Sequence, residues 1–336
     1  MKIINGDKQR SKHSETIIRS GEFAYRLDEE WGNLPEKFRY ISFCSGCCDK
    51  DDNIYLICRD YNHPIILLDS EGNYIRDLGR GLFSFLHDIY ITDRNTLLCV
   101  ETQGHVIREL TATGELIRDF GEFGKSSNSG YDPYVWRRRQ REGKLVPMNI
   151  DYDKHWALIE SLNTITCAAP PFNLPTGIAI NSKGELFCSD GYGNAAIHKI
   201  KADGTLIKTW GGPGNEPGKF LVPHCIMIDK CDRVWVGDRE GNSVHVFSDE
   251  GELIGYIPPE YLFQPSDIWA DDKNIYVGER GGITILNMEM NVVAQLGYFF
   301  SPLLIHGICG NSKSDLFLMT IGVPHTQNCL KKLTRI

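Results

Sequence analysis

Three histidines occupy the same place in three similar stretches of the sequence. They are His87 in LHDIYI, His224 in PHCIMI and His306 in IHGICG, each near the start of a short apolar run that is typical of a β-strand. Catalytic zinc commonly takes three protein ligands and keeps a fourth position for water or substrate. Imidazole also suits copper, iron and nickel. If the fold brings them together, these residues predict one transition-metal site with zinc as first choice; otherwise they are polar channel residues satisfied by water.

The stretches that hold the histidines belong to a repeat. Each copy reads as a short apolar strand, a polar turn, a second apolar strand that ends in a polar residue, and a third, alternating strand. Several copies add a fourth strand, as in GELIRDFG and GTLIKTWG. The equivalent points in six copies lie 41, 89, 48, 42 and 40 residues apart and are Gly46, His87, Thr176, His224, Ser266 and His306. Four short strands that recur in this way are the signature of propeller blades.

We therefore predict an all-β fold, a six-bladed β-propeller over residues 21–336. The one long interval indicates an insertion at about 122–171. Blade six ends near Lys332 without a clear fourth strand, whereas Glu22–Trp31 has the alternating pattern of one. We expect this N-terminal strand to complete the last blade and so to remove an exposed sheet edge. Residues 1–20 are polar and are predicted to be a flexible N-terminal segment.

The blade order predicts where the three imidazoles meet. Histidine occurs at the repeated position in blades two, four and six, which in a six-fold ring lie about 120° apart. Because the innermost strands line the central channel, three side chains at one height should converge on one point of the axis.

Several motifs carry a family resemblance. They are Ser189-Asp-Gly-Tyr-Gly-Asn194, Val222-Pro-His-Cys-Ile226 and Gly237-Asp-Arg-Glu-Gly-Asn242, with Cys58-Arg-Asp-Tyr-Asn-His63 a weaker match. The chain resembles bacterial NHL-repeat propellers similar to peptidyl-α-hydroxyglycine α-amidating lyase, over nearly its whole length from Glu22 apart from the insertion. The resemblance implies that the three histidines hold a catalytic zinc. It also implies that Arg59 is the catalytic arginine and Tyr192 the active-site tyrosine.

The chemistry of such a lyase agrees with these residue types. Cleavage of a carbinolamide requires deprotonation of its hydroxyl group and protonation of its departing amide nitrogen. A metal lowers the pKa of a bound hydroxyl, and a nearby tyrosine or arginine can move protons or stabilise an oxyanion. Arg59 and Tyr192 both follow the second strand of their blades, so they should border the same mouth. The alternative interpretations are an inter-blade ion pair for Arg59 and a packed turn aromatic for Tyr192.

The chain also departs from the family pattern. Gly307 follows His306, where the family has an aspartate that helps to bind a structural calcium ion. Asp88 and Asp267 hold the equivalent position in blades two and five and are the candidates to replace it. Gly193 stands where the family has a disulfide cysteine. These departures favour a retained site with a changed substrate.

A column of acidic residues follows the second strands. Its members are Glu101, Asp190, Asp238 and Glu279, and arginines follow two of them at Arg239 and Arg280. We interpret the acids as structural residues that hold turn amides or bridge blades. Arg239 is the best candidate here for a catalytic role.

The composition narrows the possible partners. The net charge of −8 argues against nucleic acid or an anionic membrane as the main partner. We find no apolar stretch long enough to span a membrane and no apolar core of a secretory signal. Eleven cysteines make an odd count, and Cys44-x-x-Cys47-Cys48 has no second pair that would complete a zinc site. We therefore expect a cytoplasmic protein with free thiols and a small-molecule substrate.

The predicted insertion carries aromatic residues and a basic cluster. They are Tyr131, Tyr134, Trp136 and Trp156, with Arg137, Arg138, Arg139 and Arg141. The cluster is interpreted as a solvated loop. The insertion itself either covers the channel mouth, with its arginines facing an anionic substrate, or forms an oligomer contact.

These observations favour a metal-dependent, lyase-like enzyme that acts on a small hydroxylated or carbonyl substrate at the channel mouth. The alternatives are a metal-dependent hydrolase of lactone or cyclic-ketone type and a non-catalytic NHL scaffold that binds a partner through its flat face.

Overall fold

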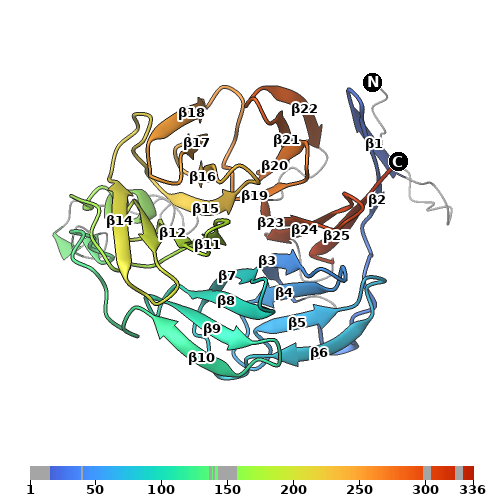
Figure 1. Ribbon diagram of the computed structural model, residues 1–336, viewed down its shortest axis with the longest axis horizontal. Coiled ribbons are helices and arrows are strands. Elements are labelled where there is room, and N and C mark those ends of the chain that lie inside the picture. Colours follow the sequence, from blue (N-terminus) through green and yellow to red (C-terminus); the bar gives the residue numbers. More distant parts are fainter. Residues whose placement is uncertain are drawn as a thin grey trace.

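The computed structural model describes residues 16–38, 41–135, 138, 141–142, 157–297, 304–321 and 328–336. Six antiparallel sheets surround a central axis, with the innermost strand of each sheet at the centre (Figure 1). This is a six-bladed β-propeller, and the prediction of the fold is confirmed. Among the described residues no helix is long and apolar enough to cross a membrane.

The blades follow one another along the chain, each numbered from its innermost strand outward. Blade one contains β3 (Phe43–Cys48), β4 (Ile54–Cys58), β5 (Ile65–Leu68) and β6 (Tyr74–Leu78), and blade two contains β7 (Leu86–Ile91), β8 (Thr96–Glu101), β9 (Val106–Thr111) and β10 (Leu116–Phe120). Blade three contains β11 (Gly177–Ile180), β12 (Leu186–Asp190), β13 (Ala196–Ile200) and β14 (Leu206–Gly211), and blade four contains β15 (Pro223–Ile228), β16 (Val234–Asp238), β17 (Ser243–Phe247) and β18 (Leu253–Ile257). Blade five contains β19 (Asp267–Ala270), β20 (Asn274–Glu279), β21 (Gly282–Asn287) and β22 (Val292–Gly297), and blade six contains β23 (Leu304–Gly310), β24 (Leu316–Ile321), β25 (Leu330–Arg335) and β2 (Phe23–Asp28). A short 3-10 helix, Glu36–Phe38, precedes blade one.

The N-terminal strand closes the ring as predicted. β2 pairs antiparallel with β25, with Tyr25 opposite Arg335. The Arg335 side chain donates to the hydroxyl oxygens of Tyr25 at 3.3 Å and of Tyr276, in blade five, at 3.0 Å. A further strand, β1 (Thr16–Ser20), pairs with β2 on the outside. The segment 1–20 that we expected to be flexible therefore contains a strand, and its residues 1–15 lie outside the described part of the chain.

The apolar core lies between neighbouring blades as well as within them. One cluster joins Phe43 of blade one to Phe317 of blade six, and another joins Phe187 of blade three to Val236 of blade four. Since each blade covers part of its neighbour's core, the stability of one blade depends on the next.

A register shift marks the innermost strands at the height of the histidines. In β7, β15 and β23 the pairing with the second strand skips His87, His224 and His306. In β3 the same shift skips Cys44. A bulge of this kind leaves one residue unpaired and redirects its side chain. The blade-one equivalent of the histidines is therefore Cys44, and our alignment at Gly46 was two residues too far along the chain.

The described part of the insertion packs beside blade three. Leu162 and Ile165 are buried in the same apolar cluster as Phe187. Arg138 forms an ion pair with Asp132, within the same loop. Trp136, Arg137, Arg139 and Trp156 lie outside the described residues, and the lid and the oligomer contact remain predictions.

Candidate metal centre

The structure brings His87, His224 and His306 together on the propeller axis. Their ligand atoms all lie within 4.8 Å of one another, and their ring centroids are 4.8 to 5.1 Å apart. All three residues are buried. Each histidine is the bulged residue of its innermost strand, which explains why three side chains from three blades point to one place.

The backbone of the intervening blades orients each imidazole ring. The Nδ1 atom of His87 lies 2.6 Å from the carbonyl oxygen of Thr176, and that of His224 lies 2.7 Å from the carbonyl oxygen of Ser266. The Nδ1 atom of His306 lies 2.6 Å from the carbonyl oxygen of Cys44. A carbonyl oxygen only accepts, so Nδ1 carries the hydrogen in each ring. The three residues that alternate with the histidines thus act as their orienting partners, an arrangement typical of metal-binding histidines.

Burial keeps the three rings neutral. Burial and the nearby Arg59 charge lower the pKa of His306 to about 3. Burial also lowers the pKa of His87 and of His224 well below the usual range, and positive neighbours lower both further. With Nδ1 protonated, each neutral ring turns an Nε2 lone pair toward the axis.

The hydroxyl group of Tyr192 faces two of these lone pairs. Its oxygen lies 3.0 Å from Nε2 of His87 and 2.9 Å from Nε2 of His224. A phenol has one proton, so only one of these nitrogens can receive it at a time. Among the described residues the other buried nitrogen then lacks a donor, although buried polar atoms are nearly always paired. A cation among the three Nε2 atoms would satisfy all of them, so the donor set fits a transition metal.

Two arginines complete the polar surroundings of the axis. Arg239 donates from Nη1 to the Tyr192 hydroxyl oxygen at 3.1 Å, and its Nε atom donates to Glu240 at 2.8 Å. An Nη2 atom of Arg59 lies 3.4 Å from Nε2 of His306, and its guanidinium lies over the Phe85 ring at 4.2 Å. The structure therefore places all six predicted site residues in one group. Sequence reasoning missed Phe85 and Glu240.

The acidic column at the ends of the second strands holds the loops that lead into the innermost strands. Glu101 accepts from the amide of Ser84 at 2.9 Å, and Asp238 accepts from the amide of Val222 at 2.7 Å. Asp190 accepts from the amide of Asn173 at 2.7 Å. The structural interpretation of these acids agrees with these contacts, because each carboxylate fixes the approach to an innermost strand.

The candidate calcium ligands lie one position farther along the innermost strands, after His87 and Ser266. Asp88 and Asp267 both line a cavity of about 270 Å³ around the axis. Asp88 accepts from Ser45 at 2.8 Å, and Asp267 accepts from the amide of Ile308 at 2.9 Å. Burial raises the pKa of Asp88 to about 6, and burial together with the Asp88 charge raises the pKa of Asp267. Replacement of the missing calcium ligand by either residue stays a hypothesis.

The Cys44-x-x-Cys47-Cys48 motif packs in the apolar core. All eleven cysteines are free, and the Cys44 thiol lies 3.6 Å from the backbone carbonyl oxygens of Ile57 and Leu86.

Comparison with known proteins finds homologues of two kinds. No family model matches the chain. It is 26% identical to NHL repeat-containing protein 3 of Homo sapiens over 251 residues. The match covers 70% of this chain and 60% of that protein. It is also 26% identical over 191 residues to a probable peptidyl-alpha-hydroxyglycine alpha-amidating lyase of Caenorhabditis elegans, covering 56% of this chain and 43% of that one. A third relative, peptidyl-alpha-hydroxyglycine alpha-amidating lyase 2 of Drosophila melanogaster, is 39% identical over 175 residues, or 46% of this chain and 41% of the relative.

These relatives confirm the resemblance to NHL-repeat proteins and to amidating lyases. The names of the two lyases suggest a catalytic function. The matched region spans about 60% or less of the length of these relatives.

Solved structures agree on the fold. A streptogramin B lyase superposes with a TM-score of 0.58 at 13% identity over 93% of this chain and 98% of its own. A gluconolactonase from Xanthomonas campestris superposes with a TM-score of 0.58 at 10% identity over 93% of this chain and 90% of its own. At these identities the likeness concerns the propeller architecture alone.

Proposed function

We propose that the protein is a metal-dependent lyase, with zinc as the first choice of metal, that cleaves a small hydroxylated or carbonyl substrate at the mouth of the channel. The observation that carries this proposal is the Tyr192 hydroxyl, whose oxygen lies within 3.0 Å of two of the clustered histidines and 3.1 Å from Arg239. A proton-transferring group beside a metal-binding donor set is what a carbinolamide lyase requires.

His87, His224 and His306 would hold the metal through their Nε2 atoms. When bound, the metal would lower the pKa of a coordinated substrate hydroxyl or polarise a carbonyl oxygen. The protein's own contribution here is orientation: three backbone carbonyls fix the rings, and burial keeps the imidazoles neutral and able to coordinate.

Tyr192 is the proposed acid–base residue. Arg239 donates to the phenol oxygen and so leaves the phenol proton free to point toward the axis. The guanidinium charge also stabilises negative charge on that oxygen after the proton leaves. Tyr192 could therefore give its proton to the departing nitrogen of a substrate and take one back from a substrate hydroxyl, so the proton count balances over one turnover.

Arg59 is the proposed binding residue for a negatively charged oxygen. Its guanidinium lies over the Phe85 ring at 4.2 Å, and its Nη2 atom lies 3.4 Å from Nε2 of His306. A planar cation held in this way can donate two parallel hydrogen bonds to one carboxylate or oxyanion. Arg59 is exposed, so an incoming substrate can reach it.

The sequence relatives favour a lyase over a hydrolase. Proteins named as lyases match the chain by sequence at 26–39% identity. The proposal is tested by offering zinc-loaded protein a panel of small carbinolamides, which are amides with a hydroxyl group on the carbon bonded to nitrogen, beside a panel of lactones and cyclic ketones. Turnover of carbinolamides to amide plus aldehyde is expected. Turnover of lactones alone would replace the lyase with a hydrolase, and turnover of neither panel would favour the scaffold.

A further inference from the structure

The short loop that carries Tyr192 is held by the two ends of the insertion. Ser129, near the start of the insertion, donates from its hydroxyl to the carbonyl oxygen of Gly193 at 2.5 Å. Ala169, near its end, exchanges two hydrogen bonds with the Asn194 side chain, at 2.8 Å and 2.5 Å. The two residues that follow Tyr192 are thus each fixed by a different end of one inserted segment.

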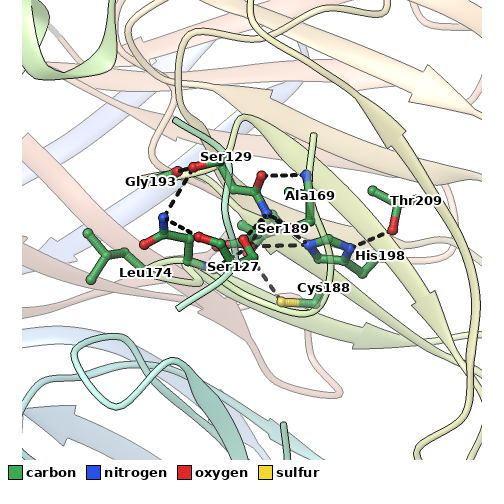
Figure 2. A network of polar contacts seen from close by, with 12 residues as sticks. Ser127, Ser129, Ala169, Leu174, Cys188, Ser189, Gly193, His198 and Thr209 are labelled. Atoms are coloured by element: carbon green, nitrogen blue, oxygen red, sulfur yellow. Dashed lines mark hydrogen bonds and ion pairs between the residues drawn. The ribbon is translucent and has the colours of Figure 1, made fainter. Parts of the chain in front are cut away.

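The two ends are also tied to each other. The amide of Ser127 donates to the carbonyl oxygen of Phe172 at 2.7 Å, and the Asn173 side chain donates to the Ser129 hydroxyl at 3.1 Å. Figure 2 shows Ser127, Ser129 and Ala169 gathered around Gly193 and His198. The insertion therefore leaves and rejoins the propeller through a single polar network.

Asp190 connects this network to the sheet of blade three. One of its oxygens accepts from the amide of Asn173 at 2.7 Å and from the Asn194 side chain at 2.7 Å. The same oxygen lies 3.1 Å from Nε2 of His198, whose Nδ1 atom lies 2.9 Å from the Thr209 hydroxyl. Asp190, Asn194 and His198 are completely buried. Because hydrogen bonds among buried groups are costly to break, the network holds the loop in one position.

Apolar and steric contacts also hold the Tyr192 loop in place. The Tyr192 ring is packed in the cluster that contains Leu162 and Ile165 of the insertion. A Cβ atom at Gly193 would lie 2.7 Å from both the carbonyl oxygen and the side-chain oxygen of Asn173, closer than real Cβ contacts. Only glycine fits at position 193. This explains why the chain lacks the disulfide cysteine that the amidating lyases it resembles have at that position.

We propose that the two described ends of the insertion position Tyr192, with Ser129 of the insertion and Asn194 of the Tyr192 loop as the positioning residues. They hold the phenol oxygen between His87 and His224 through the carbonyl of Gly193 and the side chain of Asn194. The effect on turnover rests on the proposed function, whereas the position of the ring does not depend on it.

The test measures the ring directly. Full-length protein is prepared with 3-fluorotyrosine at position 192, and its ¹⁹F resonance is recorded with and without Ser129→Ala. Thr284→Val is the matched control, because Thr284 is a fully buried hydroxyl that donates to Glu279 in blade five, a blade that supplies none of the six site residues. If Ser129→Ala fails to fold, Ser127→Ala weakens the same network at its 3.3 Å contact with Asn194.

We expect the resonance to shift or split in Ser129→Ala and to match the wild type in Thr284→Val. We also expect kcat to fall about 10-fold with KM nearly unchanged, since small misplacements of a reacting group cost rate. A wild-type resonance in Ser129→Ala, or an equal shift in Thr284→Val, would overturn the positioning role. A shifted resonance with unchanged kcat would instead remove Tyr192 from the proposed reaction and leave the positioning intact.

Discussion

The Tyr192 hydroxyl has one proton, but two imidazole nitrogens lie close enough to accept it. Two imidazole nitrogens and one guanidinium nitrogen lie within hydrogen-bonding distance of the phenol oxygen. Packing alone explains the ring, which shares an apolar cluster with the insertion, but it does not explain why the hydroxyl is aimed at the histidines. The side chain is therefore best tested by removing its oxygen alone.

Tyr192→Phe should lower turnover on the order of 10²-fold, the usual contribution of a general acid–base group. Metal content and melting temperature should stay close to the wild type, because no predicted metal ligand is lost and the ring still packs. Steady-state kinetics, elemental analysis and thermal unfolding on the same preparation measure all three. A variant with wild-type turnover and reduced stability would show that Tyr192 only packs.

Strand β2 shows what a single element contributes to the ring. It comes from the start of the chain, yet it pairs with β25 at the end, and Phe23 and Tyr25 are buried between blades five and six. β1 lies outside it and is largely exposed. The pairing covers the edge of β25, whose unpaired amides and carbonyls would otherwise be open to other chains.

Deletion of residues through Trp31 should therefore destabilise the whole molecule, whereas deletion through Ser20 should have a much smaller effect. Loss of one buried aromatic side chain such as Phe23 alone costs about 3–5 kcal/mol. Thermal unfolding and size-exclusion chromatography compare the two truncations, and the longer one should also self-associate. If both melt at the same temperature, β2 does not close the ring.

The strand pattern also explains how far the sequence could predict these elements. The repeat and the alternation of Glu22–Trp31 were sufficient for the six blades and for the closure, because both depend on local patterns of apolar residues. Cys44 was missed in favour of Gly46, because the small residues of Phe43–Cys48 give this strand no side-chain pattern that fixes its alignment with the other blades. The hydrogen bonds that hold the Tyr192 loop were missed for a different reason. Ser129 and Asn194 are far apart in the chain, and only the fold brings them to Gly193 and Ala169.

At the level of the whole molecule, the ring converts a sequence repeat into a symmetric site. Histidines at one position of alternate blades meet on the axis, and the carbonyls of the blades between them orient the rings. The six-fold arrangement places three equivalent ligands around one point without any loop that reaches across the channel. The symmetric ligand set thus belongs to the propeller itself, while Arg59, Tyr192 and Arg239 come from the loops that border it.

The proposed function depends most directly on metal binding by the three histidines on the axis. Protein purified with zinc present and then dialysed should retain about one equivalent of transition metal by elemental analysis, in line with a three-histidine site. The His87→Ala, His224→Ala double variant should retain almost none, whereas His245→Ala, which removes a buried histidine elsewhere in blade four, should retain the wild-type amount. Full metal content in the folded double variant, or none in the wild type, would contradict the axial site.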